Sequence, residues 1–412
     1  MTERLRSPVA TVVALLLLAG AIAFNVAGVR RDLNVPGRPS LTDDRQAMVD
    51  FRDTVYWPVR DLASGHDPYD PHGYLDRRPV AQELDLYAPG QLLLHAPFAL
   101  PPYETAEWVW FCVVVALVVA FGAVVLRAAG LPVLPSTVAA LGAVLLVTEP
   151  GQASVYLGQL DPEIILGCAL ALVWAGRRPN VAAAGLALAL TKPQFGVPLG
   201  LLLLARGLKR DVLRSVALAA AVSLPVVVLL VRAAGGVGAF ADHLRANVDY
   251  ALQTPYGDLA SPSGVRTDPL ALVGRLLGAR APGAVQVLLA IVVLGVTAWL
   301  ARGLDDDDPL LLALLSLAVL VAVVHAPADA LLLALPFGAI AVRRWRDPAY
   351  AVLLALLAAP FLYATRAERW VESATRSQVW AGAVTGLAVT AALLLAWMLA
   401  LRTRRNAAGN VL

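Results

Sequence analysis

A charged stretch near the start of the chain contains the residue types best suited to acid–base chemistry. It covers residues 49–71, VDFRDTVYWPVRDLASGHDPYDP, in a chain that is otherwise mostly Leu, Ala and Val. Asp50 and Asp53 are three residues apart, which places them on one face if the segment is helical. A carboxylate beside a membrane surface can act as a general base toward a hydroxyl group. The alternative is a solvated helix in which Arg52 and Arg60 pair with these carboxylates.

Three short polar motifs farther along the chain could contribute to the same site. They are Gly158-Gln159-Leu160-Asp161, Lys192-Pro193-Gln194 and His325-Ala-Pro-Ala-Asp329. A lysine at a helix break can bind a lipid phosphate, or it can extend to the membrane surface. A histidine and an aspartate four residues apart in a membrane protein are functional candidates, although they can also bond to each other and stabilise a helix hairpin.

The run Gly65–Pro71, GHDPYDP, is typical of a turn because it combines a glycine with two Asp-Pro pairs. Its spacing of His66, Asp67 and Asp70 matches no strong metal-binding pattern. We therefore expect no required cofactor, and a divalent metal remains an open alternative.

The composition is that of an integral membrane protein. Of 412 residues, 59% are hydrophobic and 15% are charged, whereas soluble domains carry about 25% charged residues. The net charge of +3 is better interpreted loop by loop than as a sign of nucleic-acid binding. Both cysteines, Cys112 and Cys168, lie in apolar segments and are expected to be buried side chains.

The apolar blocks predict an all-α polytopic membrane protein, a single integral membrane domain with about 10–12 transmembrane helices. The N-terminal apolar segment is too long for a signal peptide and is expected to be retained. Residues 180–206 form either one long helix or two short ones, and Pro193 favours a break at Thr191–Gln194. The other expected spans are residues 8–29, 105–127, 133–149, 162–176, 212–232, 283–301, 309–325, 328–342, 348–365 and 379–401.

Two long polar segments separate these spans. Residues 30–104 form the first loop, in which the short apolar run Gln91–Leu100 is expected to be a re-entrant or interfacial helix. Residues 233–282 form the second loop, and residues 402–412 form a C-terminal tail.

The basic residues predict the orientation of the chain. With the N-terminus in the cytoplasm, most arginines of the short loops fall on the cytoplasmic side, as the positive-inside rule requires, provided that the chain is broken at Lys192. The charged stretch and the three polar motifs then share the extracytoplasmic face, which predicts a functional site there. The cytoplasmic set is Arg127, Arg177, Arg178, Arg206, Lys209, Arg210, Arg214, Arg302, Arg343, Arg344, Arg346, Arg402, Arg404 and Arg405.

Several of these motifs, in this order, resemble glycosyltransferase family 87, a family of polytopic enzymes of the GT-C class. The resemblance covers about residues 45–340. The matching pieces are Asp50-Phe-Arg-Asp-Thr-Val-Tyr56, Gly65-His-Asp-Pro-Tyr69, Tyr87-Ala-Pro-Gly with Pro97 and Leu100-Pro101, Gly158-Gln159, Ala184-Gly185, Lys192-Pro193-Gln194, and His325 to Asp329 before Leu331–Pro336.

The resemblance implies an inverting transferase that takes mannose or another sugar from a polyprenyl phosphate. It implies a GT-C-like bundle, a lipid or glycan acceptor, and an acidic base in the first outer loop. That role maps best onto Asp50, but Asp50 is six residues before Tyr56 and Asp53 is three before it, so the assignment stays open between them. Many relatives have Asn where this chain has Asp161.

The expected site follows from these motifs. Asp50 or Asp53 is the expected base, and Lys192, with Arg52 or His325, is expected to offset charge on the leaving phosphate. The remaining expected substrate contacts are Tyr56, Gln159, Asp161, Gln194 and Asp329. The expected partners are the polyprenyl-phosphate-sugar donor, the acceptor and membrane lipids, without nucleic acid. A transporter or lipid flippase and a non-catalytic membrane subunit are the alternatives.

Overall fold

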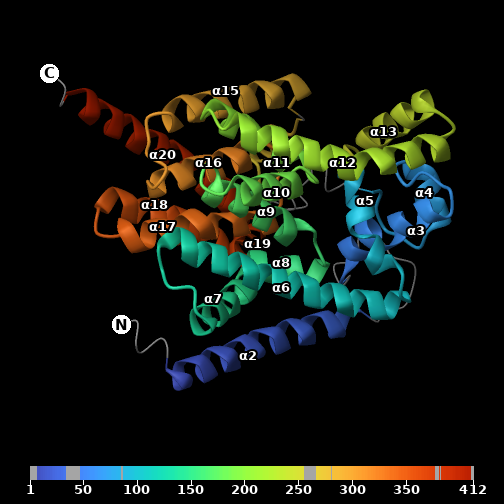
Figure 1. Ribbon diagram of the computed structural model, residues 1–412, viewed down its shortest axis with the longest axis horizontal. Helices are drawn as coiled ribbons and strands as arrows, with labels where there is room; N and C mark the ends of the chain where they lie inside the picture. Colours follow the sequence, from blue (N-terminus) through green and yellow to red (C-terminus); the bar gives the residue numbers. More distant parts are fainter. Residues whose placement is uncertain are drawn as a thin grey trace.

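The computed structural model describes residues 7–33, 47–84, 87–254, 266–279, 281–375, 380 and 382–409. Throughout these residues the regular structure is helical, without a strand, which confirms the all-α prediction (Figure 1). The helices are α2 (Pro8–Asp32), η1 (Phe51–Tyr56), α3 (Trp57–Ala63), α4 (Pro71–Arg77), α5 (Gly90–Leu94), η2 (Ala96–Ala99), α6 (Tyr103–Ala129), α7 (Pro135–Val147), α8 (Glu149–Leu157), α9 (Asp161–Trp174), α10 (Pro179–Ala189), α11 (Pro193–Ala205), α12 (Lys209–Ala234), α13 (Val237–Ala251), α14 (Pro269–Leu277), α15 (Gly283–Ala301), α16 (Pro309–Ala322), η3 (Pro327–Leu333), α17 (Ala334–Arg343), α18 (Pro348–Ala358), η4 (Ala359–Phe361), α19 (Ala364–Thr375) and α20 (Ala383–Gly409).

Five of the described helices are long and apolar enough to cross a membrane: α2, α6, α12, α15 and α20. Two bent pairs, α7 with α8 and α18 with α19, raise this number to seven if each pair is one span, with bends of 79° and 77°. The chain is therefore a multi-pass membrane protein.

Several predicted spans are shorter than expected. The predicted spans at residues 162–176 and 309–325 correspond to α9 and α16, which have 14 residues each. A helix of 14 residues is about 21 Å long, whereas the hydrocarbon core is about 30 Å thick. Nearly every residue of α16 is buried, so neighbouring helices cover it and it does not need to match the bilayer by itself.

The predicted break at Lys192 is present. Helix α10 ends at Ala189, α11 begins at Pro193, and Lys192 between them has an extended backbone. Helix α10 packs closely on α9 because a glycine lies on each side of the contact: a side chain at Gly185 would meet the backbone oxygen of Gly167 at 2.7 Å. Helices α10 and α11 form a hairpin with Lys192 at its tip.

The basic loops lie at one end of the bundle. An acidic loop, Asp305–Asp308, connects α15 to α16 there, and Arg177 and Arg206 reach its carboxylates over 2.6 Å and 2.5 Å. Arg343 donates to the carbonyl of Asp307 over 2.7 Å. In Figure 1 this is the left side, where α2 begins and α20 ends.

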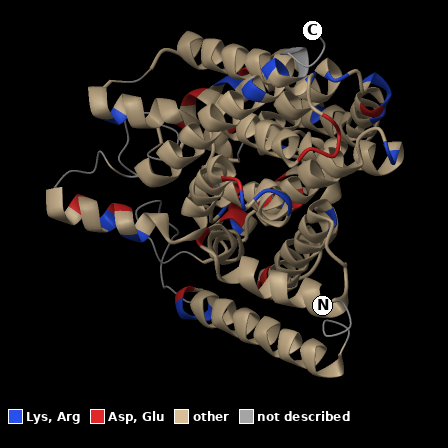
Figure 2. Ribbon diagram, turned by 90° about the vertical axis from the view of Figure 1, so that its left-hand side faces the viewer, with Lys and Arg blue, Asp and Glu red and all other residues tan. Residues whose placement is uncertain are grey.

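Described helices of the two predicted loops lie at the opposite end. Helices α3, α4 and α5 of the first loop lie there, beside α13 of the second (Figure 1). The expected interfacial run at Gln91–Leu100 folds into α5 and η2, and Leu100 is 79% exposed. Figure 2 shows that the helices are mostly uncharged along their length, with charged residues gathered near helix ends and in loops.

Candidate functional site

The segment with Asp50 and Asp53 is held against the end of α8. The backbone N–H of Met48 donates to the carbonyl of Tyr156 over 2.7 Å. Phe51 is fully buried and stacks on Trp110, with ring centroids 5.7 Å apart. Trp110 in turn donates through its indole N–H to the carbonyl of Gly158 over 2.8 Å.

Gly158 is the contact point between the two segments. Its φ of +69° is in the left-handed region, which favours glycine, and it ends α8. A Cβ at this position would lie 2.9 Å from the Cβ of Phe51 and 3.0 Å from the Cε of Met48. The glycine therefore allows the segment before Asp50 to approach α8.

Asp53 is enclosed by the protein. Its side chain has 0% exposure, and it pairs with Arg52 over 2.6 Å. One carboxylate oxygen accepts backbone N–H donations from Ala81 and Gln82 over 2.9 and 3.2 Å. Burial raises the pKa of Asp53, while Arg52 and the two backbone donors act in the opposite direction. A substrate hydroxyl has no access to this carboxylate.

Asp50 lies in a more open environment. It is partly exposed, and one of its carboxylate oxygens accepts a hydrogen bond from Nε2 of Gln82 over 3.0 Å. The two aspartates therefore differ in access, because only Asp50 is partly exposed.

Tyr56, an expected substrate contact, is 3% exposed. Its hydroxyl donates to the carbonyl of Pro101 over 3.1 Å, and Arg60 donates to the same hydroxyl over 3.2 Å. The structure thus engages Tyr56 and Arg52 in contacts within the first loop, and their predicted substrate contacts stay predictions.

Lys192 lies between two carboxylates. Its ammonium is 2.6 Å from Asp161 and 3.3 Å from Asp329, and the three side chains are 13%, 4% and 1% exposed. The second carboxylate oxygen of Asp329 accepts from the backbone N–H of Ala326 over 2.8 Å. Three distant predicted residues thus form one buried ionic cluster, in which the positive charge of Lys192 is already offset.

The segment after Tyr87 connects this cluster to the aspartate segment. The backbone N–H of Ala88 donates to the carbonyl of Thr191, next to Lys192, over 2.7 Å. Three residues later, Nε2 of Gln91 donates to the carbonyl of Thr54, next to Asp53. The predicted motifs therefore meet at one end of the bundle.

Two predicted residues present buried polar atoms without partners. Within the described residues, Oε1 of Gln159 and both ring nitrogens of His325 lack a hydrogen-bond partner. Such atoms are costly to bury unless a ligand or water satisfies them. Gln194, by contrast, donates to the carbonyl of Val324 over 3.4 Å.

A second connection, which the sequence did not indicate, joins His95 to Glu163. Nδ1 of His95 is 2.8 Å from the carbonyl of Gln91, and Nε2 is 2.9 Å from the carboxylate of Glu163. A carbonyl can only accept, so Nδ1 carries a proton. The contact to Glu163 then requires a second proton, on Nε2 or on the carboxylate.

The turn motif has structural partners. Nδ1 of His243 in α13 lies 2.9 Å from the carboxylate of Asp67, and Asp70 caps α4 by accepting from the N–H of Gly73 over 3.2 Å. Within the described residues, no three His, Cys, Asp or Glu side chains are grouped to hold a metal. The predicted metal independence stays a prediction.

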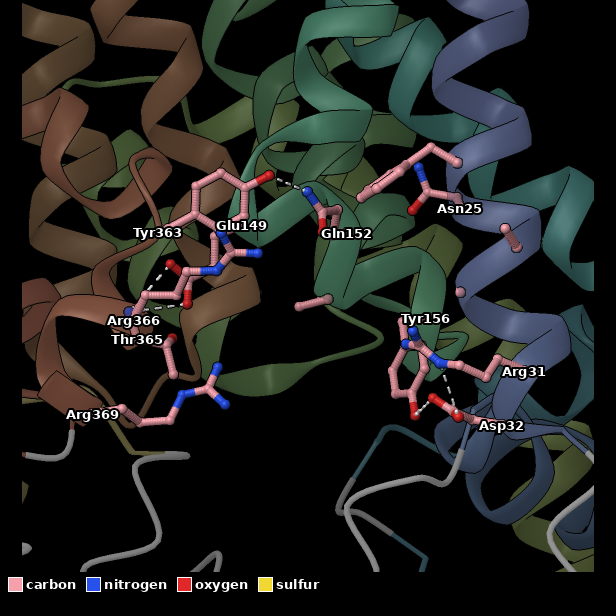
Figure 3. Close-up of a pocket in the computed structure, with 14 residues that line it drawn as sticks. Asn25, Arg31, Asp32, Glu149, Gln152, Tyr156, Tyr363, Thr365, Arg366 and Arg369 are labelled. Carbon is pink, nitrogen blue, oxygen red and sulfur yellow. Dashed lines mark hydrogen bonds and ion pairs between the residues drawn. The ribbon is translucent and has the colours of Figure 1, made fainter. Parts of the chain in front are cut away.

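A large cavity lies beside α8. Its volume is about 1020 Å³, and it is bounded by α2, by α8 and by residues around the start of α19 (Figure 3). Tyr156, whose carbonyl holds Met48, lines it. The cavity therefore adjoins the segment that carries Asp50.

The model of glycosyltransferase family 87 matches residues 86–336. The chain belongs to this family. The match includes Gln159, Asp161, Lys192 and the His325–Asp329 motif, and it begins after the segment with Asp50 and Asp53. No curated protein and no solved structure matches the chain. Family 87 membership makes the protein a membrane glycosyltransferase, and it favours this class over the transporter and the non-catalytic subunit.

Proposed function

We propose that this glycosyltransferase transfers a sugar, mannose or another hexose or pentose, from a polyprenyl phosphate to a lipid or glycan acceptor. A donor held in the membrane suits a chain whose regular structure, within the described residues, is helical, without the strands of a nucleotide-binding domain. The reaction takes place on the extracytoplasmic face of the plasma membrane, with both termini in the cytoplasm, in agreement with the positive-inside rule. The observation that carries the proposal is the meeting of the family motifs with a partly exposed Asp50.

Asp50 is the proposed general base. It accepts the proton of the acceptor hydroxyl while that oxygen attacks the anomeric carbon. The bond from the anomeric carbon to the phosphate oxygen breaks, its electron pair leaves with the lipid phosphate, and the configuration inverts. Asp53 fits a positioning role because its own donors already surround it.

The neighbouring residues have proposed roles in this step. Gln159, which is partly exposed, contacts a substrate hydroxyl group. His325 is 1% exposed, as inaccessible as Asp53, and therefore has a proposed positioning role. The cluster of Asp161, Lys192 and Asp329 holds three segments together, and the contacts of Lys192 favour this role over binding of the leaving phosphate. No divalent metal is required in this scheme.

The deciding experiment is sugar transfer by the purified protein in detergent. The donor is radiolabelled polyprenyl-phosphate mannose, the acceptor is a membrane-lipid extract, and Asp50→Asn and Asp53→Asn are assayed beside the wild type. Transfer that is lost in Asp50→Asn with a normal unfolding temperature would support the proposal. Full transfer by Asp50→Asn would refute the role of this base. Loss of activity on chelation would refute the metal-free scheme.

A further inference from the structure

The cavity beside α8 has no role in the transfer step as proposed above. It lies between α2 on one side and residues 363–369 on the other, with α8 at its back (Figure 3). Its volume of about 1020 Å³ is large enough for a headgroup and part of a chain.

Its polar lining has an excess of positive charge. Arg31, Arg366 and Arg369 face two carboxylates, Asp32 and Glu149. Such an excess in a largely apolar protein indicates an anionic ligand.

Both carboxylates already accept hydrogen bonds from the protein. Asp32 accepts from the hydroxyl of Tyr156 over 3.0 Å and from Arg31 over 3.3 Å. Glu149 accepts the backbone N–H of Thr365 on both oxygens, over 3.1 and 3.2 Å. Asp32 is therefore occupied by its own donors, whereas Glu149 still interacts electrostatically with Arg366 and Arg369 and offsets part of their charge.

Arg366 and Arg369 are the cations most available to a ligand. They are three residues apart at the start of α19, which places them on one face, and both are exposed. Within the described parts of the chain neither forms an ion pair, and Arg366 lies over the ring of Tyr363 at 4.4 Å. A planar guanidinium binds phosphate through two parallel hydrogen bonds.

The opposite wall is suited to a hydrocarbon chain. Phe24, Ala27 and Gly28 of α2 line it, and Phe24 is 55% exposed. Helix α2 packs mainly on α7 and α8, so its remaining faces are open to lipid. A ligand with an anionic head and an apolar chain matches both walls.

Two residues with left-handed backbone contact cavity residues of α8, and one of them, Tyr363, also lines the cavity. Met48 and Tyr363 are the two non-glycine residues in the described segments with positive φ, at +59° and +58°. Met48 bonds to Tyr156 and Tyr363 bonds to Gln152, and both partners are cavity residues on α8. A strained backbone position such as that of Tyr363 is common at functional sites.

We propose that this cavity binds a lipid phosphate, with Arg366 and Arg369 on the phosphate and α2 along the hydrocarbon chain. The cavity also reaches the segment of Asp50, since Tyr156 lines it and holds Met48, and in Figure 3 Tyr156 lies across the cavity from Arg366 and Arg369. Only the identification of this lipid with the sugar donor depends on the proposed function.

Binding to the full-length protein in nanodiscs of neutral phosphatidylcholine tests the proposal. The probes are undecaprenyl phosphate, undecaprenol and phosphatidylglycerol, titrated separately. We expect undecaprenyl phosphate to bind more tightly than undecaprenol, and Arg366→Gln/Arg369→Gln to weaken its binding by about tenfold or more. Arg366→Lys/Arg369→Lys, which keeps the charge but not the paired donors, should weaken it less.

The matched control is Arg344→Gln/Arg346→Gln at the other end of the bundle. These arginines are also exposed, and each also lies over an aromatic ring. The control should bind like the wild type. Three results would overturn the proposal. The Arg366→Gln/Arg369→Gln variant could bind undecaprenyl phosphate as tightly as the wild type, or the control could lose as much binding as that variant. Undecaprenol could also bind as tightly as undecaprenyl phosphate.

The remaining outcomes separate the cavity from the reaction. Arginine-dependent binding of phosphatidylglycerol alone supports a phosphate site and assigns it to a bilayer lipid. If undecaprenyl phosphate binds in an arginine-dependent way but no sugar is transferred, the cavity proposal is supported and the proposed function fails. Transfer without arginine-dependent binding supports the function while the cavity proposal fails.

Discussion

Gln82 donates to Asp50 through its side-chain amide over 3.0 Å, and its backbone N–H donates to Asp53 over 3.2 Å. One residue of the first loop therefore orients both candidate carboxylates. The Asp53 carboxylate is fully buried and needs this donor to offset the cost of desolvation, whereas the Asp50 side chain is partly exposed. Substitution of Asp50 and substitution of Asp53 are therefore expected to have different effects.

Asp50→Asn is expected to lower sugar transfer by about 10²–10⁴-fold, because it removes the proton acceptor without changing the shape of the side chain. The unfolding temperature should remain that of the wild type, since Asp50 is partly exposed. Steady-state transfer and a thermal melt in detergent measure both quantities. A large drop in the melting temperature would assign Asp50 a structural role instead.

Asp53→Asn is expected to act mainly on stability. It leaves Arg52, whose side chain is 14% exposed, without its buried partner. Breaking a buried pair costs about 3–5 kcal/mol. We expect a lower unfolding temperature and poor yield, with transfer per folded molecule reduced much less than in Asp50→Asn. A stable but inactive variant would contradict this division of roles.

Lys192→Met is expected to destabilise the protein because Asp161 and Asp329 would remain buried without their cation. The cost is about 3–5 kcal/mol for one broken pair. Asp161→Asn and Asp329→Asn, added to Lys192→Met, should recover most of the lost stability, since no charge remains to be paired. A Lys192→Met protein with normal stability and weakened donor binding would instead support a phosphate-binding lysine.

Gly158→Ala is expected to displace the aspartate segment. The added Cβ would meet Phe51 at 2.9 Å, and the left-handed backbone disfavours alanine. Transfer should fall and the protein should be destabilised by about 1–3 kcal/mol. Gly207→Ala is the matched control, because Gly207 also has positive φ but nothing lies near its Cβ. Equal effects of both changes would show that backbone strain alone is responsible.

His95→Gln tests the connection between α5 and α9. It should weaken the contacts of His95 to Gln91 and Glu163. Because Gln91 also bonds to Thr54, we expect lower transfer together with altered protection of residues 50–56 in hydrogen exchange. Glu163→Gln should have a milder effect, because its amide can accept from a charged ring through oxygen or donate to a neutral ring through nitrogen. Unchanged exchange in His95→Gln would contradict this positioning role.

Much of the architecture could be predicted from apolar length, and the break at Pro193 from the missing backbone donor of proline. The short helices could not, because α16 reaches its burial through neighbours that only the tertiary structure reveals. The motifs with Asp161, Lys192 and Asp329 could be assigned to one end of the bundle from the orientation alone. Their joining in one cluster depends on side-chain directions, which spacing does not determine.

The sequence could not distinguish Asp50 from Asp53, since both are aspartates on one short segment. The distinction comes from residues 81–82, about thirty positions away, whose N–H groups enclose Asp53. Gln82, Gln91 and the His95–Glu163 contact escaped prediction because single polar residues in a loop carry no periodic signal. Arg366 and Arg369 lie outside the cytoplasmic set that the positive-inside rule predicts, and the cavity offers them a proposed ligand.

The acidic loop at the other end of the bundle restricts how the molecule can move. Arg177, Arg206 and Arg343, from three separate connections, all bond to residues 304–307. The helix ends next to these three arginines cannot separate from the acidic loop without losing these contacts. These contacts oppose separation of the helices at this end, so the opposite end, where Asp50 lies, is the less restrained end of the bundle.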